Sequence, residues 1–175
     1  VGNMIVSSAD LSNSDKTDGF LKKTHAIQKG DFSGQFLQAG VSELTMACVM
    51  IGMSLHGGII PACGTFFVFS DYCKPAIRLG ALMRLPSIFV FSHDSFYVGE
   101  DGPTHEPVEH LASMRVIPGL TTFRPADANE TAYAWVEAIL NTKGPTCIMT
   151  TRQNVPVLEG VRHEGVANGG YVIYE

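Results

Sequence analysis

The fold is decided by the apolar run Ser87-Ile88-Phe89-Val90-Phe91 and by the loop that follows it, His93-Asp94-Ser95-Phe96-Tyr97-Val98-Gly99-Glu100-Asp101-Gly102-Pro103-Thr104-His105-Glu106-Pro107-Val108-Glu109. A run that is apolar at successive positions is typical of a strand covered on both faces, as in a parallel sheet. The loop is rich in histidine, carboxylate, glycine and proline. Because open α/β folds bind ligands beyond the carboxyl ends of their strands, we expect functional residues here.

Apolar runs and helical patterns alternate along the rest of the chain. Strands are expected at residues 4–7, 59–66, 87–91, 120–123 and 146–151. Helices are expected at residues 42–55, 70–83, 107–114 and 127–140. This alternation predicts an α/β fold with a mainly parallel sheet and helices on both faces.

Local signals refine these expected elements. The segment 11–34 is polar and lacks periodicity, so it is expected to be a long loop. Ser42 and Asp127 are expected to cap the helices that follow them. Pro75 is expected in the first turn of its helix, where proline is tolerated.

Composition bounds the classes of function. The chain has 175 residues, 45% of them apolar and 17% charged, which suits one sizeable core. A net charge of -5 without a cluster of basic residues argues against nucleic-acid binding. Neither a signal peptide nor a run of membrane-spanning length is present, so no membrane is expected. The four cysteines lack metal-site spacing, which favours free thiols and a cytoplasmic location.

The loop after residue 91 holds the first candidate site. His93, Asp101 and His105 could converge on one pocket, because glycines and prolines shape the loop between them. Imidazoles can donate to phosphate and hydroxyl oxygens, and they move protons near neutral pH. The alternative is a solvated loop with one histidine capping a helix. Two histidines and a carboxylate on one shaped loop favour function.

Two further signals have two explanations each. Glu43 lies in the first turn of an apolar helix, where a carboxylate complements the helix dipole and needs no other role. Phe66, Phe69 and Tyr72 recur every three residues, which usually indicates a core stripe. Aromatic residues that pass from a strand end into a helix start could also wall a slot for a flat heterocycle.

Taken together, the motifs resemble the central, pyrimidine-binding domain of transketolase. The matching motifs, in chain order, are Ser8-Ala9-Asp10-Leu11, Ser54-Leu55-His56-Gly57-Gly58, Thr65-Phe66 with Phe69 and Tyr72, His93-Asp94-Ser95, Gly99 to Glu109, Phe123-Arg124-Pro125-Ala126-Asp127, and Thr151-Arg152-Gln153-Asn154. The resemblance implies the thiamine diphosphate-binding fold and transfer of a two-carbon ketol unit between sugar phosphates. Deoxyxylulose phosphate synthases and 2-oxo acid dehydrogenase beta subunits are similar more weakly.

The resemblance also implies roles toward the cofactor. Glu43 matches a catalytic glutamate that carries or shares a proton with N1′ of the aminopyrimidine and promotes its imino tautomer. That tautomer removes the proton from C2 of the thiazolium. Phe66, Phe69 and Tyr72 match the aromatic pocket for the pyrimidine ring. Asp10 matches a carboxylate near the cofactor, at the end of the first strand.

Roles toward the substrate follow in the same way. Ser14, His93 and Arg152 match groups that bind the sugar phosphate, a task that suits a guanidinium and a hydroxyl. Asp101 matches the residue that reads the hydroxyl next to the carbonyl. His105 matches a catalytic group close to the reacting carbonyl and the C1 hydroxyl.

The resemblance sets the expected organisation. Residues 1–160 would form the pyrimidine-binding domain, truncated at its N-terminus, and residues 161–175 a linker toward a C-terminal domain. No metal ligand is expected on this chain. A separate diphosphate-binding domain would hold Mg²⁺ or Ca²⁺, and a homodimer would hold the cofactor between its subunits. The isolated chain would therefore be inactive.

Some features depart from the family's pattern, and alternatives stay open. Ser42 stands where arginine is expected before the glutamate, and Leu44-Thr45 replace an aromatic-glycine pair. Neither departure removes a catalytic group. The alternatives are a domain of another thiamine diphosphate enzyme, such as 1-deoxyxylulose-5-phosphate synthase, and a non-catalytic transketolase-like binding module.

Overall fold

A computed structural model describes residues 2–174, and its centre is a six-stranded sheet with the strand order β2-β1-β3-β4-β6-β5. Every neighbouring pair of strands is parallel. The strands are β1 (Met4–Ser8), β2 (Phe36–Gln38), β3 (Ile60–Phe66), β4 (Ile88–Ser92), β5 (Thr121–Phe123) and β6 (Thr146–Met149). The predicted α/β class with a parallel sheet is confirmed.

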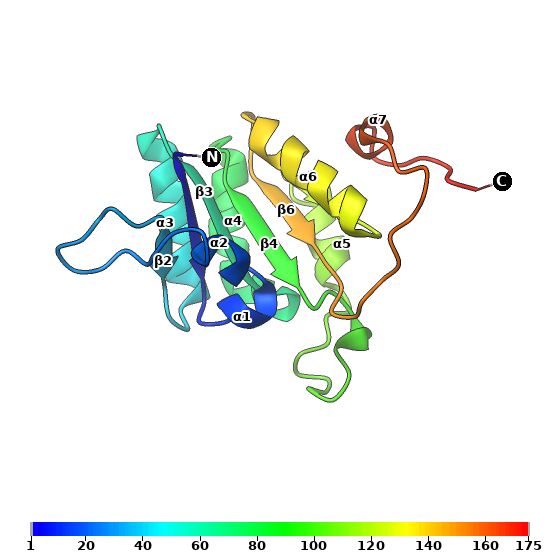
Figure 1. Cartoon of the computed structure of the whole chain (residues 1–175), viewed down its shortest axis with the longest axis horizontal. Coiled ribbons are helices and arrows are strands. Elements are labelled where there is room, and N and C mark those ends of the chain that lie inside the picture. The colour runs from blue at the N-terminus through cyan, green and yellow to red at the C-terminus, as the bar shows by residue number, and fades with distance from the viewer. Residues whose placement is uncertain (1, 175) are drawn as a thin grey trace.

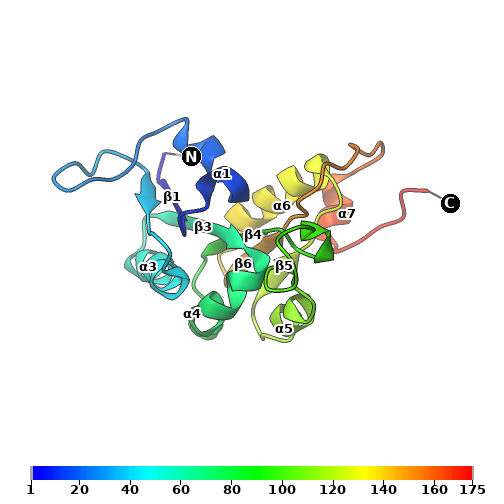
Figure 2. The same ribbon diagram turned by 90° about the horizontal axis from the view of Figure 1, so that it is seen from below.

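Helices cover both faces of this sheet (Figures 1 and 2). The helices α3, α4 and α5 lie on one face, whereas α1, α6 and α7 lie on the other (Figure 2). The helices are α1 (Ser12–Asp15), α2 (Asp18–Leu21), α3 (Glu43–His56), α4 (Ser70–Leu82), α5 (His110–Arg115), α6 (Ala128–Leu140) and α7 (His163–Ala167), with 3-10 turns at η1 (Phe67–Phe69) and η2 (Phe96–Val98).

Strand β4 shows why the deciding run is apolar throughout. Phe89 and Phe91 belong to the core cluster shared with α3, α4 and α5. Ile88 and Val90 belong to the second cluster, shared with α6. Side chains alternate between the faces of a strand, so a strand covered on both sides needs apolar residues at every position. Each such side chain contributes about 1.5–3 kcal/mol when fully buried.

The predicted loop at residues 11–34 was partly wrong. It contains α1 and α2, and strand β2 follows it and pairs with β1. These elements are three or four residues long, too short to show a period, and tertiary contacts hold them. Phe36 of β2 is 1% exposed within a core cluster, and its carbonyl accepts from the backbone N–H of Ile27 at 2.7 Å. Helix α7, five residues long, was not predicted either.

Two local predictions were wrong and one was confirmed. The Ser42 hydroxyl donates to the carbonyl of Ala39 at 2.8 Å, so it does not cap α3. Pro75 lies in the second turn of α4, because that helix begins at Ser70. The Asp127 carboxylate accepts from the backbone N–H of Glu130 at 2.8 Å and caps α6, as predicted.

The register of the sheet aligns the carboxyl ends of its central strands. Ser8 pairs with Gly64, and Phe66 pairs with Ser92. Phe91 pairs with Met149. The segments that follow β1, β3, β4 and β6 therefore leave the sheet at one edge. Within residues 2–174, no helix has the length and apolarity that a membrane crossing requires.

Candidate functional site

The predicted site residues gather at this carboxyl edge of the sheet. Asp10 and Ser14 follow β1, and Phe66 ends β3. His93 follows β4, and Arg152 follows β6. Residues that are up to 142 positions apart therefore share one edge. Parallel topology is the cause, because each strand delivers its following residues to the same side.

Three aromatic rings, Phe66, Phe69 and Tyr72, form an aromatic wall. The ring centroids of Phe66 and Phe69 are 6.1 Å apart, with planes 6° from parallel. Those of Phe69 and Tyr72 are 6.2 Å apart. The 3-10 turn η1 explains the stacking, because side chains at i and i+3 eclipse in that geometry. The wall runs from Phe66, 8% exposed, to Tyr72, 61% exposed. This gradient favours a slot open to solvent over a core stripe.

His93 extends this wall toward β4. Its ring stacks on Phe66 with centroids 3.8 Å apart and planes 22° apart. The residue is 8% exposed and has a φ of 59°, a left-handed conformation that is uncommon outside glycine. Its Nδ1 lies 2.9 Å from the Ser92 hydroxyl, which leaves Nε2 for a ligand. His93 is therefore not a solvated loop residue.

The electrostatic surroundings keep His93 neutral. Burial lowers the pKa of the His93 ring, and the nearby Arg152 guanidinium lowers this pKa further. The Asp101 carboxylate acts in the opposite direction. A neutral imidazole can donate through one nitrogen while the other accepts from Ser92.

The second loop histidine also contacts the aromatic wall. The His105 ring meets Phe69 edge-on, with centroids 5.4 Å apart. Its Nδ1 lies 3.0 Å from the Thr104 hydroxyl. His93 and His105 thus contact two successive rings of the wall, so both ends of the predicted loop cluster face it.

A cavity of about 330 Å³, here called the edge cavity, lies beside His93. Its lining includes three predicted residues, Ser14, His93 and Arg152. The residues that sequence reasoning missed are Asn13, Lys16, Ser92, Thr150 and Thr151. Arg152 also forms an ion pair with Glu100, with Nη2 and Oε1 3.3 Å apart, and both side chains are substantially exposed. Two cations, a histidine and several hydroxyls make this cavity suitable for an anion.

Glu43 is the first residue of α3 and is buried, at 9% exposure. The Cys73 thiol donates to the carbonyl of Glu43 at 3.6 Å, so the start of α3 packs against α4 next to Tyr72. Burial, and then the Glu43 charge, raise the pKa of the Cys73 thiol to about 12. The Glu43 backbone thus lies at the contact between α3 and α4, and Cys73 is the residue after Tyr72 of the aromatic wall.

Two predicted carboxylates lie on the surface of the same edge. Asp10 is exposed and has a φ of 63°. Asp101 is exposed within the loop. Among residues 2–174, neither has a side-chain hydrogen-bond partner, so the structure brings them to the edge without fixing their orientation.

An ion pair joins the segment that follows His93 to the motif at residues 123–127. The Nε of Arg124 lies 2.6 Å from Oδ2 of Asp94, whose side chain is 3% exposed. This ion pair joins the residues after β4 to the residues after β5. The backbone next to His93 is therefore held from both sides, which is what an unusual φ requires.

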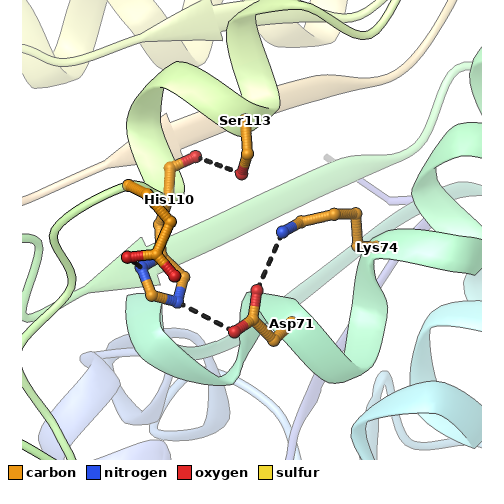
Figure 3. A network of polar contacts seen from close by, with 5 residues as sticks. Asp71, Lys74, His110 and Ser113 are labelled. Atoms are coloured by element: carbon orange, nitrogen blue, oxygen red, sulfur yellow. Dashed lines mark hydrogen bonds and ion pairs between the residues drawn. The ribbon is translucent and has the colours of Figure 1, made fainter.

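A polar network fixes the far end of the loop (Figure 3). His110 Nε2 lies 3.1 Å from Oδ2 of Asp71, and Lys74 Nζ lies 2.8 Å from the other oxygen. The Ser113 hydroxyl donates to the His110 carbonyl at 2.8 Å. The His110 ring also lies near Phe67, with centroids 5.8 Å apart. The loop is thus anchored to the start of α4 beside the aromatic wall.

Two of these residues, Asp71 and His110, form with Glu109 the single group within residues 2–174 with metal-like spacing. Ligand atoms of Asp71, Glu109 and His110 lie within 4.8 Å of one another. The Asp71 oxygens already accept from the Lys74 ammonium and the His110 ring. A cation would have to compete with that ammonium, so we describe the group as an ion-pair network.

A larger cavity of about 700 Å³ lies on the α6 side of the sheet. Its lining is mainly apolar and includes Phe20, Val90 and Trp135. Of the predicted site residues it contains Arg152. Lys16, Thr150, Thr151 and Arg152 line both cavities, whereas Ser14 and His93 line the edge cavity.

Comparisons with known proteins agree with this geometry. Residues 1–157 match the family described as "Transketolase, pyrimidine binding domain". The chain is 52% identical over 169 residues to the transketolases of Halalkalibacterium halodurans and Bacillus subtilis, which covers 95% of the chain and 25% of each relative. The chain thus spans about a quarter of the length of these relatives.

Solved structures show the same fold. Transketolase from Leishmania mexicana superposes with a TM-score of 0.95 at 38% identity, over 98% of this chain and 26% of that one. Pichia stipitis transketolase in complex with sedoheptulose 7-phosphate superposes with a TM-score of 0.95 at 40% identity, over 100% of this chain and 26% of that one. A split-gene transketolase, described as an inactive beta4 tetramer, gives 0.71 at 30% identity, over 91% and 49%.

Proposed function

Because this chain belongs to the transketolase family as a pyrimidine-binding domain, we propose that it works as the central domain of a complete transketolase. The complete enzyme would move a two-carbon ketol unit from a ketose phosphate to an aldose phosphate. One observation carries the proposal: His93 belongs both to the stacked aromatic series and to the edge cavity. A ring-binding surface and an anion-binding surface therefore adjoin at one residue.

The cofactor of this family is thiamine diphosphate, which supplies the reactive carbon when it is bound. We propose that the aromatic wall packs against its aminopyrimidine ring. Glu43, buried at the start of α3, would hold a proton at N1′ of that ring. Asp10, exposed after β1, would lie near the cofactor.

We propose that the edge cavity receives the sugar phosphate. Arg152 supplies a guanidinium whose fork suits phosphate oxygens, and Ser14 supplies a hydroxyl. Neutral His93 would donate to the phosphate through Nε2. Asp101 would read the hydroxyl next to the carbonyl, and His105, held on Phe69, would act near the reacting carbonyl.

An exposed apolar surface on α3 supports a proposal about the protein partners. Helix α3 is apolar around its circumference and exposes Leu44 and Leu55, at 48% and 62%. An apolar face of this kind is usually covered by protein. We propose that a second copy covers it in a homodimer, with the cofactor between subunits. A separate diphosphate-binding domain would hold Mg²⁺ or Ca²⁺.

The organisation of the chain is part of the same proposal. Residues 1–160 would form the pyrimidine-binding domain, and residues 161–175 would lead to a C-terminal domain. Helix α7 in the latter segment packs on α6, where the Tyr171 hydroxyl donates to Glu130 at 2.9 Å. Four free cysteines fit a cytoplasmic location.

The test is product analysis with the complete enzyme. Xylulose 5-phosphate and ribose 5-phosphate should exchange a two-carbon unit. Formation of deoxyxylulose phosphate from pyruvate would instead indicate the related synthase. Absence of turnover with both donors would favour a non-catalytic module.

A further inference from the structure

We propose that Lys16 is a second phosphate-binding cation, which sets the preference of the edge cavity for phosphorylated over unphosphorylated sugars. This inference rests on the proposed function and adds a residue to its site. Lys16 is exposed and lines the edge cavity with Ser14 and Arg152. Its helix, α1, packs against β3 and β4 at their carboxyl ends (Figure 1).

The backbone of Lys16 has an unusual conformation. Its φ is 68° and its ψ is 12°, and it directly follows the last residue of α1. Glycine is the usual residue at such a position, because the left-handed region costs other residues roughly 1–2 kcal/mol. A solvent-exposed lysine without contacts would not offset this cost. Contacts of the neighbouring residues must therefore stabilise the conformation.

The neighbours on both sides hold Lys16 in place. The buried Asp15 carboxylate accepts from the Ser8 hydroxyl at 2.6 Å and from the N–H and hydroxyl of Thr17 at 2.9 and 2.7 Å. Gly64 of β3 leaves room for this network, since a Cβ there would lie 2.7 Å from Thr17 Cγ2 and 3.0 Å from Asp15 Oδ2. The residues flanking Lys16 are thus tied to β1 and β3, while its side chain is exposed.

The Lys16 ammonium has unused capacity for an anion. It donates to the carbonyl of Asn13 at 3.1 Å, which leaves two of its three N–H groups. In the part of the chain that the structure describes, no carboxylate forms an ion pair with it. The Asp15 carboxylate is turned into its own buried network, and Asp94 is paired with Arg124.

The charges around the cavity favour a dianion. Lys16 and Arg152 both act on His93, whose pKa they lower in addition to the effect of burial. Lys16 and Arg152 line the same cavity, so both positive groups border the space that a phosphate would occupy. The Arg152 guanidinium supplies a planar fork, and a lysine supplies a compact charge on a flexible stem. A phosphate between them would gain charge-assisted hydrogen bonds from both sides.

Equilibrium binding of ribose 5-phosphate and of ribose to the complete enzyme tests this role. In Lys16→Met, the Kd of ribose 5-phosphate should rise roughly tenfold, the value of one hydrogen bond to a charged group, while the affinity for ribose stays as in the parent. Lys16→Arg should restore most of the loss. The matched control is Lys29→Met, because Lys29 is an exposed cation on the 28–31 turn, away from the cavity.

The outcomes separate this inference from the proposed function. An unchanged Kd in Lys16→Met, or an equal loss in Lys29→Met, would overturn the role of Lys16. Because binding is measured without turnover, a tenfold loss in an enzyme that fails to transfer ketol units would support Lys16 and contradict transketolase activity.

Discussion

The aromatic wall and the edge cavity lie at the same edge of the sheet but are assembled in different ways. The wall comes from seven consecutive residues, in which the 3-10 turn η1 and the first turn of α4 bring together the rings of Phe66, Phe69 and Tyr72. The cavity comes from three distant segments, represented by Ser14, His93 and Arg152. Spacing along the chain therefore sets the geometry of the first, whereas sheet topology sets that of the second.

If the aromatic wall binds the cofactor and the edge cavity binds the phosphate, substitutions in the two regions should affect different measurements. A change beside the wall should affect cofactor activation and cofactor affinity. A change in the cavity should affect the affinity for phosphorylated sugars.

The largest effect is expected on the wall side, at Glu43. Glu43→Ala in the complete enzyme should lower turnover by about 10²- to 10⁴-fold, because proton transfer at N1′ of the pyrimidine is lost. Exchange of the thiazolium C2 proton, followed by NMR, should slow to a similar degree. Glu159→Ala removes an exposed carboxylate and serves as the control. Normal exchange in Glu43→Ala would rule out its role.

A smaller and different effect is expected in the cavity, at Arg152. Arg152→Ala should raise the KM for ribose 5-phosphate by about 10- to 100-fold, because a charge-assisted contact to phosphate is removed. Steady-state kinetics measure this change. The control is Arg78→Ala, an exposed position on α4. A fall in C2 proton exchange, with the KM unaltered, would contradict the division between the two regions.

A modest effect is expected at the open end of the wall. Tyr72 is 61% exposed and stacks on one neighbour, so Tyr72→Ala removes one aromatic pair, worth about 0.5–1.5 kcal/mol. Titration calorimetry should show the Kd of thiamine diphosphate rising by roughly 2- to 10-fold. Tyr174→Ala provides the matched control, with Tyr174 75% exposed. If the phosphate affinity changes instead, the wall is not the cofactor side.

The smallest effect concerns pH, at the residue that joins the two regions. The folded-state pKa of His93 lies below its usual value of 6.5, mainly because the ring is buried. The folded chain thus binds fewer protons than the unfolded chain, so His93 costs no stability above about pH 6.5. Its cost grows as the pH falls from 6.5 through the folded-state pKa.

Thermal unfolding of the complete enzyme measures this contribution. The Tm should fall with pH below 6.5, and His93→Gln should flatten the decline. His56→Gln, which replaces an exposed histidine outside the site, should leave the decline as it is. A parallel decline in His93→Gln and in the parent would show that the burial of His93 does not control this pH range.

Part of the fold could be predicted from the sequence, for clear reasons. The runs at 59–66 and 87–91 are apolar at successive positions, which identified central strands of a parallel sheet. The helices at 43–56 and 128–140 are long enough to show a period. Strand β2 and the helices α1, α2 and α7 could not be found in this way, because three to five residues carry no period.

The residues of the candidate site also fall into those that the sequence indicated and those that only the structure revealed. Three-residue spacing left a core stripe and an aromatic wall both open, and motif order identified the family that the comparisons then established. Lys16 was missed, although it stands two residues after Ser14. A charged residue in a segment without periodicity is usually a solvent-exposed residue with no specific role. Its place in the cavity depends on the Asp15 network and on Gly64 of a different strand.

The sequence by itself determined the α/β class, the family and the residue types available at the carboxyl edge, because apolar periodicity and motif order are properties of the chain. Tertiary structure decided which of those residues share a ligand. His93 reached both the wall and the cavity only because β4 lies between β3 and β6 in the sheet. Strand order depends on how the crossover helices pack against the two faces of the sheet. Local sequence does not encode which strands become neighbours.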